Sequence, residues 1–424
     1  MTYQNTLEFA QHLDHQDPLK HFRSRFFIPQ HNRIDWIYFA GNSLGLQPKS
    51  VKTHVDTELD EWARLGVEAH FDAKTPWFSY HEIFPELLSS LVGCLPNEVV
   101  VMNQLTTNLH LLMISFYRPT KKKFKIICEA KSFPSDQYAL ESQVKLHGLD
   151  PAETIIEIHP AQGKYVITTD QIIDAIQKHK EELLLVLFGG VHYYSGQLFN
   201  MKAITEAAHA AGAIAGFDLA HAVGNVPLQL HEWGVDFACW CSYKYLNSGP
   251  GGVAGAYIHE RHVANTDLPR LAGWWGYNKN TRFKMEKGFE AIPTAEGWQT
   301  SNAPILSMAA HKASLDIFDE AGMDALQEKS RLLTGFLFFL LEEINKEADH
   351  PIEVITPSNE NERGCQVSIL VERKGKEVFD ELLKHGVLAD WREPNVIRIA
   401  PVPLYNTFEE VWQFANIFNK ILRA

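Results

Sequence analysis

Five short apolar runs in the middle of the chain constrain its fold more than any other feature. They are rich in β-branched and large apolar residues, and they occupy 125–130, 182–190, 213–221, 236–243 and 253–259. Runs of this kind predict strands that are buried on both faces. Between two of them, residues 201–212 have an amphipathic helix pattern that ends at Gly212, where a left-handed cap is expected. A strand, a helix and a strand in this order predict an α/β fold with a mainly parallel sheet.

The pattern changes after Asn302. Residues 305–321 and 323–343 have long helical patterns, whereas 365–372 and 395–402 alternate as antiparallel strands do. We therefore expect a smaller α+β C-terminal domain. The expected division is an N-terminal arm over 1–60 that contributes to the small domain, a large α/β domain over 61–303, and the small domain over 304–424.

Composition and charge exclude several classes of protein. The 424 residues include 39 Lys and Arg against 52 Asp and Glu, a net charge of −13, which would repel a nucleic-acid backbone. No apolar stretch approaches the ~18 residues that a membrane span needs. The N-terminal sequence lacks the features of a signal peptide, and the five cysteines cannot all pair, so a cytoplasmic protein with free thiols is expected. The histidines show no HExxH motif and Cys239-x-Cys241 has no partner motif, so we expect no metal.

Polar residues gather where the central strands end, which is where α/β sheets bind ligands. One strand ends at Asp218, with His221 three residues later, and the next ends in Ser242, Tyr243 and Lys244. A lysine buried there is unusual because burial penalises its charged form. A Schiff base with pyridoxal phosphate removes that penalty, and an aspartate can keep the pyridine nitrogen protonated. Lys244 and Asp218 fit these two tasks.

Two further segments could complete such a cofactor site. Thr106 and Thr107 open an apolar helix pattern, and the backbone amides of a helix start with a hydroxyl can bind a phosphate. An ordinary helix cap is the better interpretation of that segment alone. Phe133 follows a strand and could stack on a planar ring, with Asp136 at the polar edge of the ring, although the segment alone is typical of a turn.

Several strings in the chain resemble the kynureninase family, which consists of fold-type-I pyridoxal-phosphate enzymes. They are FAGNSLGLQPK, NQLTTNLHLL, SFPSDQYA, GFDLAHAVGNVPLQLHEWGVDFACWCSYKYLNSGPGG, TRFKM and RIAPVPLYN. The likeness covers nearly the whole chain and is most specific over 216–252. It implies hydrolysis of the Cβ–Cγ bond of L-kynurenine or 3-hydroxykynurenine to L-alanine and anthranilate or 3-hydroxyanthranilate. The expected setting is tryptophan catabolism, with NAD biosynthesis as a further expectation.

The resemblance also assigns roles to individual residues. It makes Lys244 the Schiff-base lysine and Asp218 the partner of the pyridine nitrogen. The reaction itself needs a base for the Cα proton, which the freed Lys244 amine can be, and a proton relay when water adds to the γ-carbonyl, for which Tyr243 is the best candidate. Trp274 and Asn302 would reach in from the second subunit of a homodimer with shared sites. The remaining cofactor residues that it implies are Leu105, Thr106, Phe133, Pro134, Ser135, Asp136, Gly189 and His221.

The substrate site follows from the same resemblance. Arg398 would bind the α-carboxylate, because a guanidinium binds a carboxylate bidentately and stays charged, and Ser43 is assigned to the same site. His70, Ser301 and Asn302 match kynureninases that prefer 3-hydroxykynurenine, and all three can hydrogen-bond a phenolic hydroxyl. The alternative is that His70 is structural or at the surface and the other two only turn the chain.

One position departs from the family. Where this chain has Gly189, the family often has a hydroxyl residue, so one cofactor contact is either lost or replaced by backbone or water. Three rival interpretations stay open: another fold-type-I enzyme, such as an aminotransferase or a cysteine desulfurase; a nicotinamide dehydrogenase; and a cofactor-binding protein without catalysis. A desulfurase needs a cysteine on a loop, and a dehydrogenase needs a helix after a GxGxxG motif.

Overall fold

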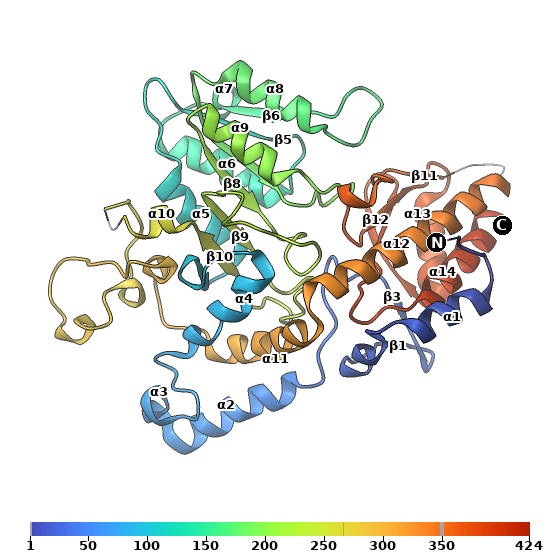
Figure 1. Cartoon of the computed structure of the whole chain (residues 1–424), viewed down its shortest axis with the longest axis horizontal. Coiled ribbons are helices and arrows are strands. Elements are labelled where there is room, and N and C mark those ends of the chain that lie inside the picture. Colours follow the sequence, from blue (N-terminus) through green and yellow to red (C-terminus); the bar gives the residue numbers. More distant parts are fainter. Residues whose placement is uncertain (1, 266, 348–351) are drawn as a thin grey trace.

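A seven-stranded sheet forms the centre of the larger part of the molecule. The computed structural model describes residues 2–265, 267–347 and 352–424 (Figure 1). The strand order is β4-β10-β9-β8-β7-β5-β6, and β10 is antiparallel to both its neighbours, whereas β9, β8, β7, β5 and β6 are parallel. The predicted α/β fold with a mainly parallel sheet is therefore confirmed. The strands are β4 (Val99–Val101), β5 (Lys125–Glu129), β6 (Ile155–Ile158), β7 (Leu183–Gly189), β8 (Ile214–Asp218), β9 (Phe237–Trp240) and β10 (Gly255–Ile258).

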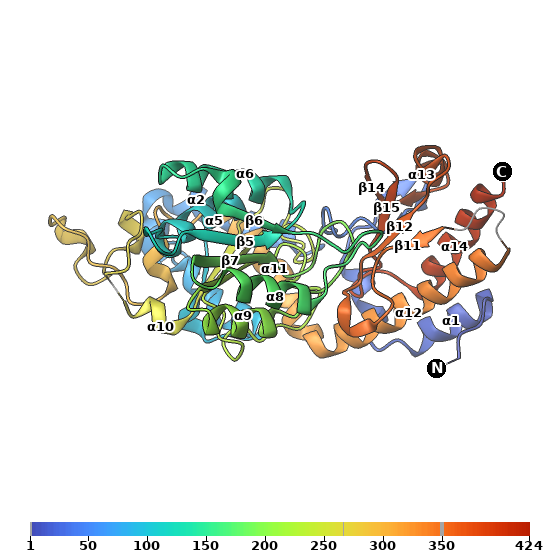
Figure 2. The same ribbon diagram turned by 90° about the horizontal axis from the view of Figure 1, so that it is seen from above.

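Helices cover both faces of this sheet, as Figure 2 shows. Alternate residues of a strand point to opposite faces, so Leu185 and Leu187 of β7 pack toward α5 (Leu105–Phe116) and α6 (Pro134–Leu146). Val186 and Phe188 pack toward α8 (Thr169–His179) and α9 (Met201–Ala210). Both faces are thus buried, which explains why these strands read as continuous apolar runs.

The predicted crossover helix is α9. Its first turn is capped by the Asn200 side chain, which accepts a hydrogen bond from the Ala203 amide, and Gly212 beyond its end has the expected positive φ of 66°. Lys123 Nζ donates to the carbonyls of Ala211 and Gly212 at 2.6 and 3.2 Å. Lys123, which belongs to the basic run at 121–125, therefore neutralises the carbonyl end of α9.

The C-terminal part contains the predicted antiparallel sheet, with the order β11-β12-β15-β14. Helices pack on one side of it around a second apolar core (Figure 1). The N-terminal arm joins this core through α1 (Leu7–Gln16) and through β3 (Ile37–Tyr38), which pairs in parallel with β13 (Val387–Leu388). The other elements are β11 (Glu353–Val354), β12 (Val367–Leu370), β14 (Asp390–Arg392), β15 (Val396–Ile399), α12 (Met323–Glu347), α13 (Gly375–Lys384) and α14 (Phe408–Leu422).

Two helices connect the parts differently from the predicted division. Helix α11 (Ile305–Ala321), expected in the small domain, packs against α2 (Val51–Leu65), and its Met308, Leu315 and Phe318 lie in the core of the larger part. The following helix, α12, begins in that core with Leu326 and continues into the second core from Leu333. The two cores thus meet along α12, downstream of residue 304.

The remaining short elements complete the large part and the arm: β1 (Gln30–His31), β2 (Ile34–Asp35), α3 (Ala69–Asp72), α4 (Pro85–Val92), α7 (Pro151–Thr154) and α10 (Glu260–Val263). The five cysteines are free thiols. Among the described residues, none of the helices combines the length and apolar character needed to cross a membrane.

Candidate active site

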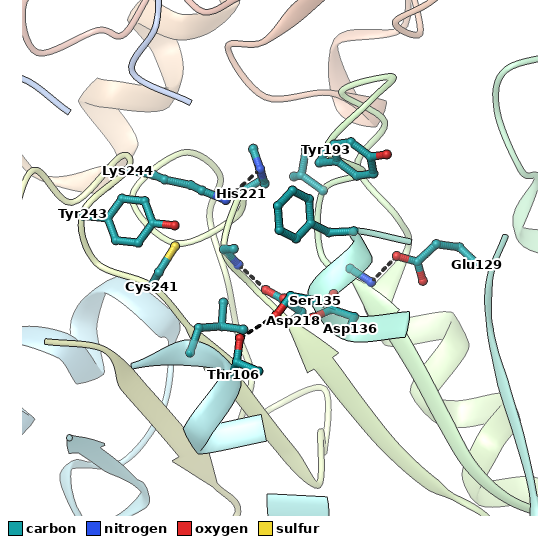
Figure 3. A pocket seen from close by; sticks show the side chains of 15 residues that line it. Thr106, Glu129, Ser135, Asp136, Tyr193, Asp218, His221, Cys241, Tyr243 and Lys244 are labelled. Atoms are coloured by element: carbon teal, nitrogen blue, oxygen red, sulfur yellow. Dashed lines mark hydrogen bonds between the residues drawn. The ribbon is translucent and has the colours of Figure 1, made fainter. Parts of the chain in front are cut away.

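A cavity opens at the carboxyl ends of β5, β7, β8 and β9, where ligands are expected in such sheets (Figure 3). About 550 Å³ of space lies between its walls when the open solvent at its mouth is included. Most of the cofactor residues expected from the sequence meet here. The lining consists of Leu105, Thr106, Glu129, Phe133, Ser135, Asp136, Gly189, Val191, Tyr193, Asp218, Ala220, His221, Cys241, Tyr243 and Lys244.

Lys244 and His221 form a polar pair in this cavity (Figure 3). Lys244 Nζ lies 3.0 Å from His221 Nε2. Lys244 lies four residues after β9 ends and is only 8% exposed. Burial, and then the charge of Lys244, lower the pKa of His221 well below its usual range. The imidazole is therefore neutral and can accept a hydrogen bond from the lysine.

Two buried carboxyl groups lie side by side below the lysine. Burial, followed by the charge of Asp218, raises the pKa of Asp136, so Asp136 keeps a proton and can donate it to Asp218. Asp218 also accepts the Ala220 amide at 2.7 Å and is stabilised by Lys244, although burial raises its pKa as well. The pair therefore shares one proton, with the negative charge on Asp218.

Two helices begin at the same end of the cavity. Thr106 stands in the first turn of α5 and Ser135 in the first turn of α6, and their hydroxyl oxygens are 2.6 Å apart. Unpaired amides of a first turn favour a negative charge. The hydroxyls and the helix starts thus form an anion site, and the helix expected at Thr106 is confirmed as an element.

An aromatic wall faces the lysine. The Phe133 ring centroid lies 5.7 Å from Lys244 Nζ and 5.4 Å from the ring of Tyr193, to which it is nearly perpendicular. Tyr193 is not among the site residues predicted from the sequence. Its position three residues after the predicted strand 182–190 could have indicated it. Glu129 and Cys241 also line the cavity, and they lie within the last residues of the predicted strands 125–130 and 236–243.

Arg398 and Ser43 meet each other outside the lining. Arg398, on β15, is 1% exposed, and its Nη2 lies 2.8 Å from Asp390 Oδ2 and 3.4 Å from Ser43 Oγ. The Ser43 hydroxyl also donates to Asp390. Arg398 Nη1 donates to the Tyr193 carbonyl at 2.5 Å, so the guanidinium is joined to the cavity through a residue of its wall.

The other expected site residues lie elsewhere in a single chain. His70 Nδ1 bonds the Val67 carbonyl at 3.0 Å, and the ring packs against Trp77. Trp274 is 42% exposed and lines a separate hollow, while Ser301 and Asn302 are exposed. Pro134 begins α6 between two lining residues. The roles expected for these residues stay predictions.

Position 189 has a definite backbone contact. The Gly189 amide donates to Glu129 Oε1 at 3.0 Å.

The expected absence of a metal stays a prediction, because two groups of described residues have metal-compatible spacing: Glu98, His231 and His259, and His81, Glu82 and Glu296. Neither group lines the cavity.

Several unsatisfied polar atoms make the cavity fit a bound polar group. Glu129 Oε2, Asp136 Oδ1 and His221 Nδ1 are buried and have no hydrogen-bond partner in the part of the chain that the structure describes. Buried polar atoms are costly when unpaired, so a ligand that pairs with them recovers that cost. An amine, an aspartate charge, an aromatic wall and an anion site fit the aldehyde, ring nitrogen, ring face and phosphate of pyridoxal phosphate.

Solved structures of other proteins share this fold. An apo cysteine desulfurase from Thermococcus onnurineus NA1 has a TM-score of 0.75 at 18% identity, covering 92% of this chain and 95% of the other. A cystine lyase variant with glycine covalently linked to its pyridoxal-phosphate cofactor has a TM-score of 0.75 at 15% identity, covering 90% and 96%. The fold-type-I architecture expected from the sequence is thereby confirmed.

Relatives by sequence are much closer. Kynureninase from Flavobacterium psychrophilum is 55% identical over 420 residues, covering 99% of both chains, and the human kynureninase is 49% identical over 430 residues, covering 97% of this chain and 92% of the other. The family model for the kynureninase C-terminal domain matches residues 326–418. Identity of this extent over almost the whole length shows that the chain belongs to the kynureninase family.

Proposed function

We propose that this protein is a pyridoxal-phosphate-dependent kynureninase that hydrolyses the Cβ–Cγ bond of L-kynurenine and 3-hydroxy-L-kynurenine. The products are L-alanine and anthranilate or 3-hydroxyanthranilate. The observation that carries the proposal is the convergence of Lys244, His221 and Asp218 on one cavity in a chain that belongs to this family. The reaction belongs to tryptophan catabolism and feeds NAD biosynthesis when the hydroxylated substrate is used.

The cofactor would be held by residues that the cavity already brings together. Lys244 would carry it covalently, Asp218 would face the ring nitrogen, Phe133 the ring, and the starts of α5 and α6 the phosphate. When bound, pyridoxal phosphate supplies an electron sink for the carbanion formed at Cα. Asp218 favours that chemistry because its charge, stabilised by the Ala220 amide, keeps the ring nitrogen protonated.

Lys244 and His221 hold the proton that the reaction moves at Cα. The Lys244 amine would accept that proton, and neutral His221, whose Nε2 lies 3.0 Å from Lys244 Nζ, would orient the amine. His221 is suited to this task because an imidazolium would repel the ammonium form of the lysine.

Tyr243 can deliver a proton during the addition of water to the γ-carbonyl. Burial raises the pKa of its phenol, so the hydroxyl keeps its proton at neutral pH. It is half-buried in the cavity and hydrogen-bonded to Cys241, and its hydroxyl points toward the Cys241 sulfur (Figure 3). A protonated hydroxyl in this place acts as a donor or relay, and a separate base has to activate the water.

Arg398 would bind the α-carboxylate of the substrate. In the structure its guanidinium pairs with Asp390 and Ser43. The substrate carboxylate would compete with Asp390 for Arg398, and Ser43 could follow either carboxylate with its hydroxyl. The buried position of Arg398 requires this exchange, because no face of the guanidinium is open to solvent.

A homodimer with shared sites would complete the pocket. An exposed apolar surface on the segment 271–289 includes Leu271, Trp274, Phe283, Met285 and Phe289. Phe283 stacks on Phe78, so the surface continues toward α3. A patch of this extent suits an interface, and a partner seated there could receive Trp274 and Asn302. In such a dimer, His70, Ser301 and Asn302 would favour 3-hydroxykynurenine. Separately, the free thiols support a cytoplasmic location.

The direct test uses purified protein loaded with pyridoxal phosphate. Incubation with L-kynurenine and with 3-hydroxy-L-kynurenine should each release L-alanine in equal amount to the aromatic product, with higher kcat/KM for the hydroxylated substrate. Lys244→Ala is the matched control and should be inactive. Formation of L-alanine from L-cysteine, with sulfide released only when dithiothreitol is added as the reductant, and without cleavage of either kynurenine, would instead favour the desulfurase alternative.

A further inference from the structure

Glu129 ends β5 with a carboxyl group that is only partly satisfied. The residue is 4% exposed and lines the cavity. Its Oε1 accepts the Gly189 amide at 3.0 Å, whereas Oε2 is buried and has no hydrogen-bond partner among the described residues. The Gly189 bond ties the ends of β5 and β7 together but leaves one oxygen available.

The missing side chain at residue 189 gives this carboxyl group its space. A Cβ added to Gly189 would lie 3.1 Å from Glu129 Oε1, 3.5 Å from the Val191 carbonyl oxygen and 3.9 Å from that of Asp218. A side chain at residue 189 would therefore point directly at the Glu129 carboxyl group. Glu129 thus occupies the place beside the end of β8 that a short polar side chain at 189 would reach.

The protonation of Glu129 fits a donor. Burial, together with the charge of Asp218, raises the pKa of Glu129 to about 8, although the hydrogen bond from the Gly189 amide acts in the opposite direction. At neutral pH most molecules therefore carry the neutral acid, with one O–H to donate. A neutral group also avoids a second negative charge beside Asp218, where Asp136 is protonated as well.

We propose that Glu129 is a further cofactor-binding residue, whose Oε2 hydrogen-bonds a polar substituent of pyridoxal phosphate and replaces the contact that a hydroxyl side chain at residue 189 would make. This inference rests on the proposed function, because it assumes that pyridoxal phosphate occupies the cavity. It answers the question raised by Gly189: the contact is moved to the neighbouring strand.

The test measures cofactor binding, independently of turnover. Apoprotein of each variant is titrated with pyridoxal phosphate, and the dissociation constant is taken from tryptophan fluorescence and from the visible band of the bound cofactor. Glu129→Ala should weaken binding about tenfold, the loss of one buried hydrogen bond. Glu129→Gln should stay within about threefold of wild type, because its amide can accept from Gly189 and still donate. Glu157→Ala, on the neighbouring strand β6 and exposed, is the control and should not change binding.

A rescue experiment separates a cofactor contact from a purely structural role. In the Glu129→Ala background, Gly189→Ser places a hydroxyl where the carboxyl group was and should recover about fivefold of the lost affinity. In the wild-type background the same change crowds Glu129 and should weaken binding. A structural role alone predicts no rescue.

Each outcome decides the proposal. Wild-type affinity in Glu129→Ala, equal losses in Ala and Gln, or no rescue by Gly189→Ser would overturn it. If Glu129→Ala fails to fold by circular dichroism, Glu129→Gln and the Gly189→Ser single variant decide: Gln should bind nearly as wild type and Ser more weakly, and the reverse order overturns it. Wild-type apoprotein that binds no pyridoxal phosphate would contradict the proposed function instead.

Discussion

At the scale of single residues, Lys244 carries the strongest expectation. It is the lysine in the cavity lining, and Asp218 and His221 lie beside it. Protein loaded with pyridoxal phosphate should absorb in the visible range and lose that band on reduction with borohydride. Peptide mapping should then find the cofactor on Lys244. A label on another lysine, or an active protein without colour, would reject the assignment.

Asp218 offers a separate test of the electronic role. Asp218→Ala should lower kcat by at least about a hundredfold, because a ring nitrogen without its charged partner is a poor electron sink. Asp218→Glu keeps the charge and should lose less than Ala. Thermal melting of the apoprotein checks that folding is preserved. Turnover near the wild-type rate in Asp218→Ala would contradict the role.

The predicted preference for 3-hydroxykynurenine rests on His70, Ser301 and Asn302, which lie outside the cavity lining of a single chain. A site that hydrogen-bonds the phenolic hydroxyl penalises a substrate without it, since polar groups are then left unpaired. His70→Trp with Asn302→Thr should therefore lower kcat/KM for 3-hydroxykynurenine more than for kynurenine, by about tenfold in the ratio. An unchanged ratio of the two kcat/KM values, or a wild-type enzyme that prefers kynurenine, would show that these residues do not recognise the ring hydroxyl.

At the scale of secondary-structure elements, Asp236 joins three of them. Just before β9, it accepts hydrogen bonds from His209 of α9 at 2.8 Å, from His262 of α10 at 2.7 Å, and from the Ala215 amide of β8 at 2.8 Å. Burial alone would raise the pKa of Asp236, but these hydrogen bonds hold it well below its usual range. The charged form is thus the stabilising one.

The consequence is a defined pH dependence. Asp236→Asn should lower the free energy of unfolding by about 3 kcal/mol at pH 7, because the partly exposed His209 and His262 and the buried Ala215 amide lose a buried charged partner. A depressed pKa contributes stability above the unfolded value of ~3.8, and this contribution is lost as pH falls toward the folded value. The difference in melting temperature between wild type and variant should therefore be full at pH 6 and shrink below pH 4. A difference independent of pH would show that shape, not charge, is responsible.

The elements also show what the sequence could predict. The runs that became β5, β7, β8, β9 and β10 were long enough for their pattern to be recognised. Strands of two or three residues, such as β4, β13 and β14, have no readable period and are defined only by their partners. In the site, Lys244 and Asp218 follow strand ends and were predictable. The contact of Glu129 with Gly189 joins residues 60 apart in the sequence, and that of Arg398 with Tyr193 joins residues 205 apart. The local sequence around these residues does not predict either contact.

At the scale of the whole molecule, the distant position of Trp274 has to be explained. The segment that carries it extends away from the sheet (Figure 1), and its Leu271, Trp274 and Met285 side chains are exposed, while Phe283 stacks on Phe78. A protein that exposes such a surface as a monomer would be prone to association. A two-fold partner would cover the surface and could bring Trp274 and Asn302 to the opposite cavity, since each subunit makes the same contacts in a symmetric dimer.

Mixing two inactive variants tests this arrangement. One subunit carries Lys244→Ala, and the other carries Trp274→Ala with Asn302→Ala. A mixed dimer then has one site with an intact Lys244 from the second subunit and intact Trp274 and Asn302 from the first. With free exchange at equal amounts, half of the dimers are mixed and each has one repaired site, so about one quarter of wild-type activity should return. Exchange is followed with differently tagged subunits, and each variant alone is the control. Proven exchange without recovery of activity would mean that each chain builds its site alone, and the exposed surface around Trp274 would then need another partner.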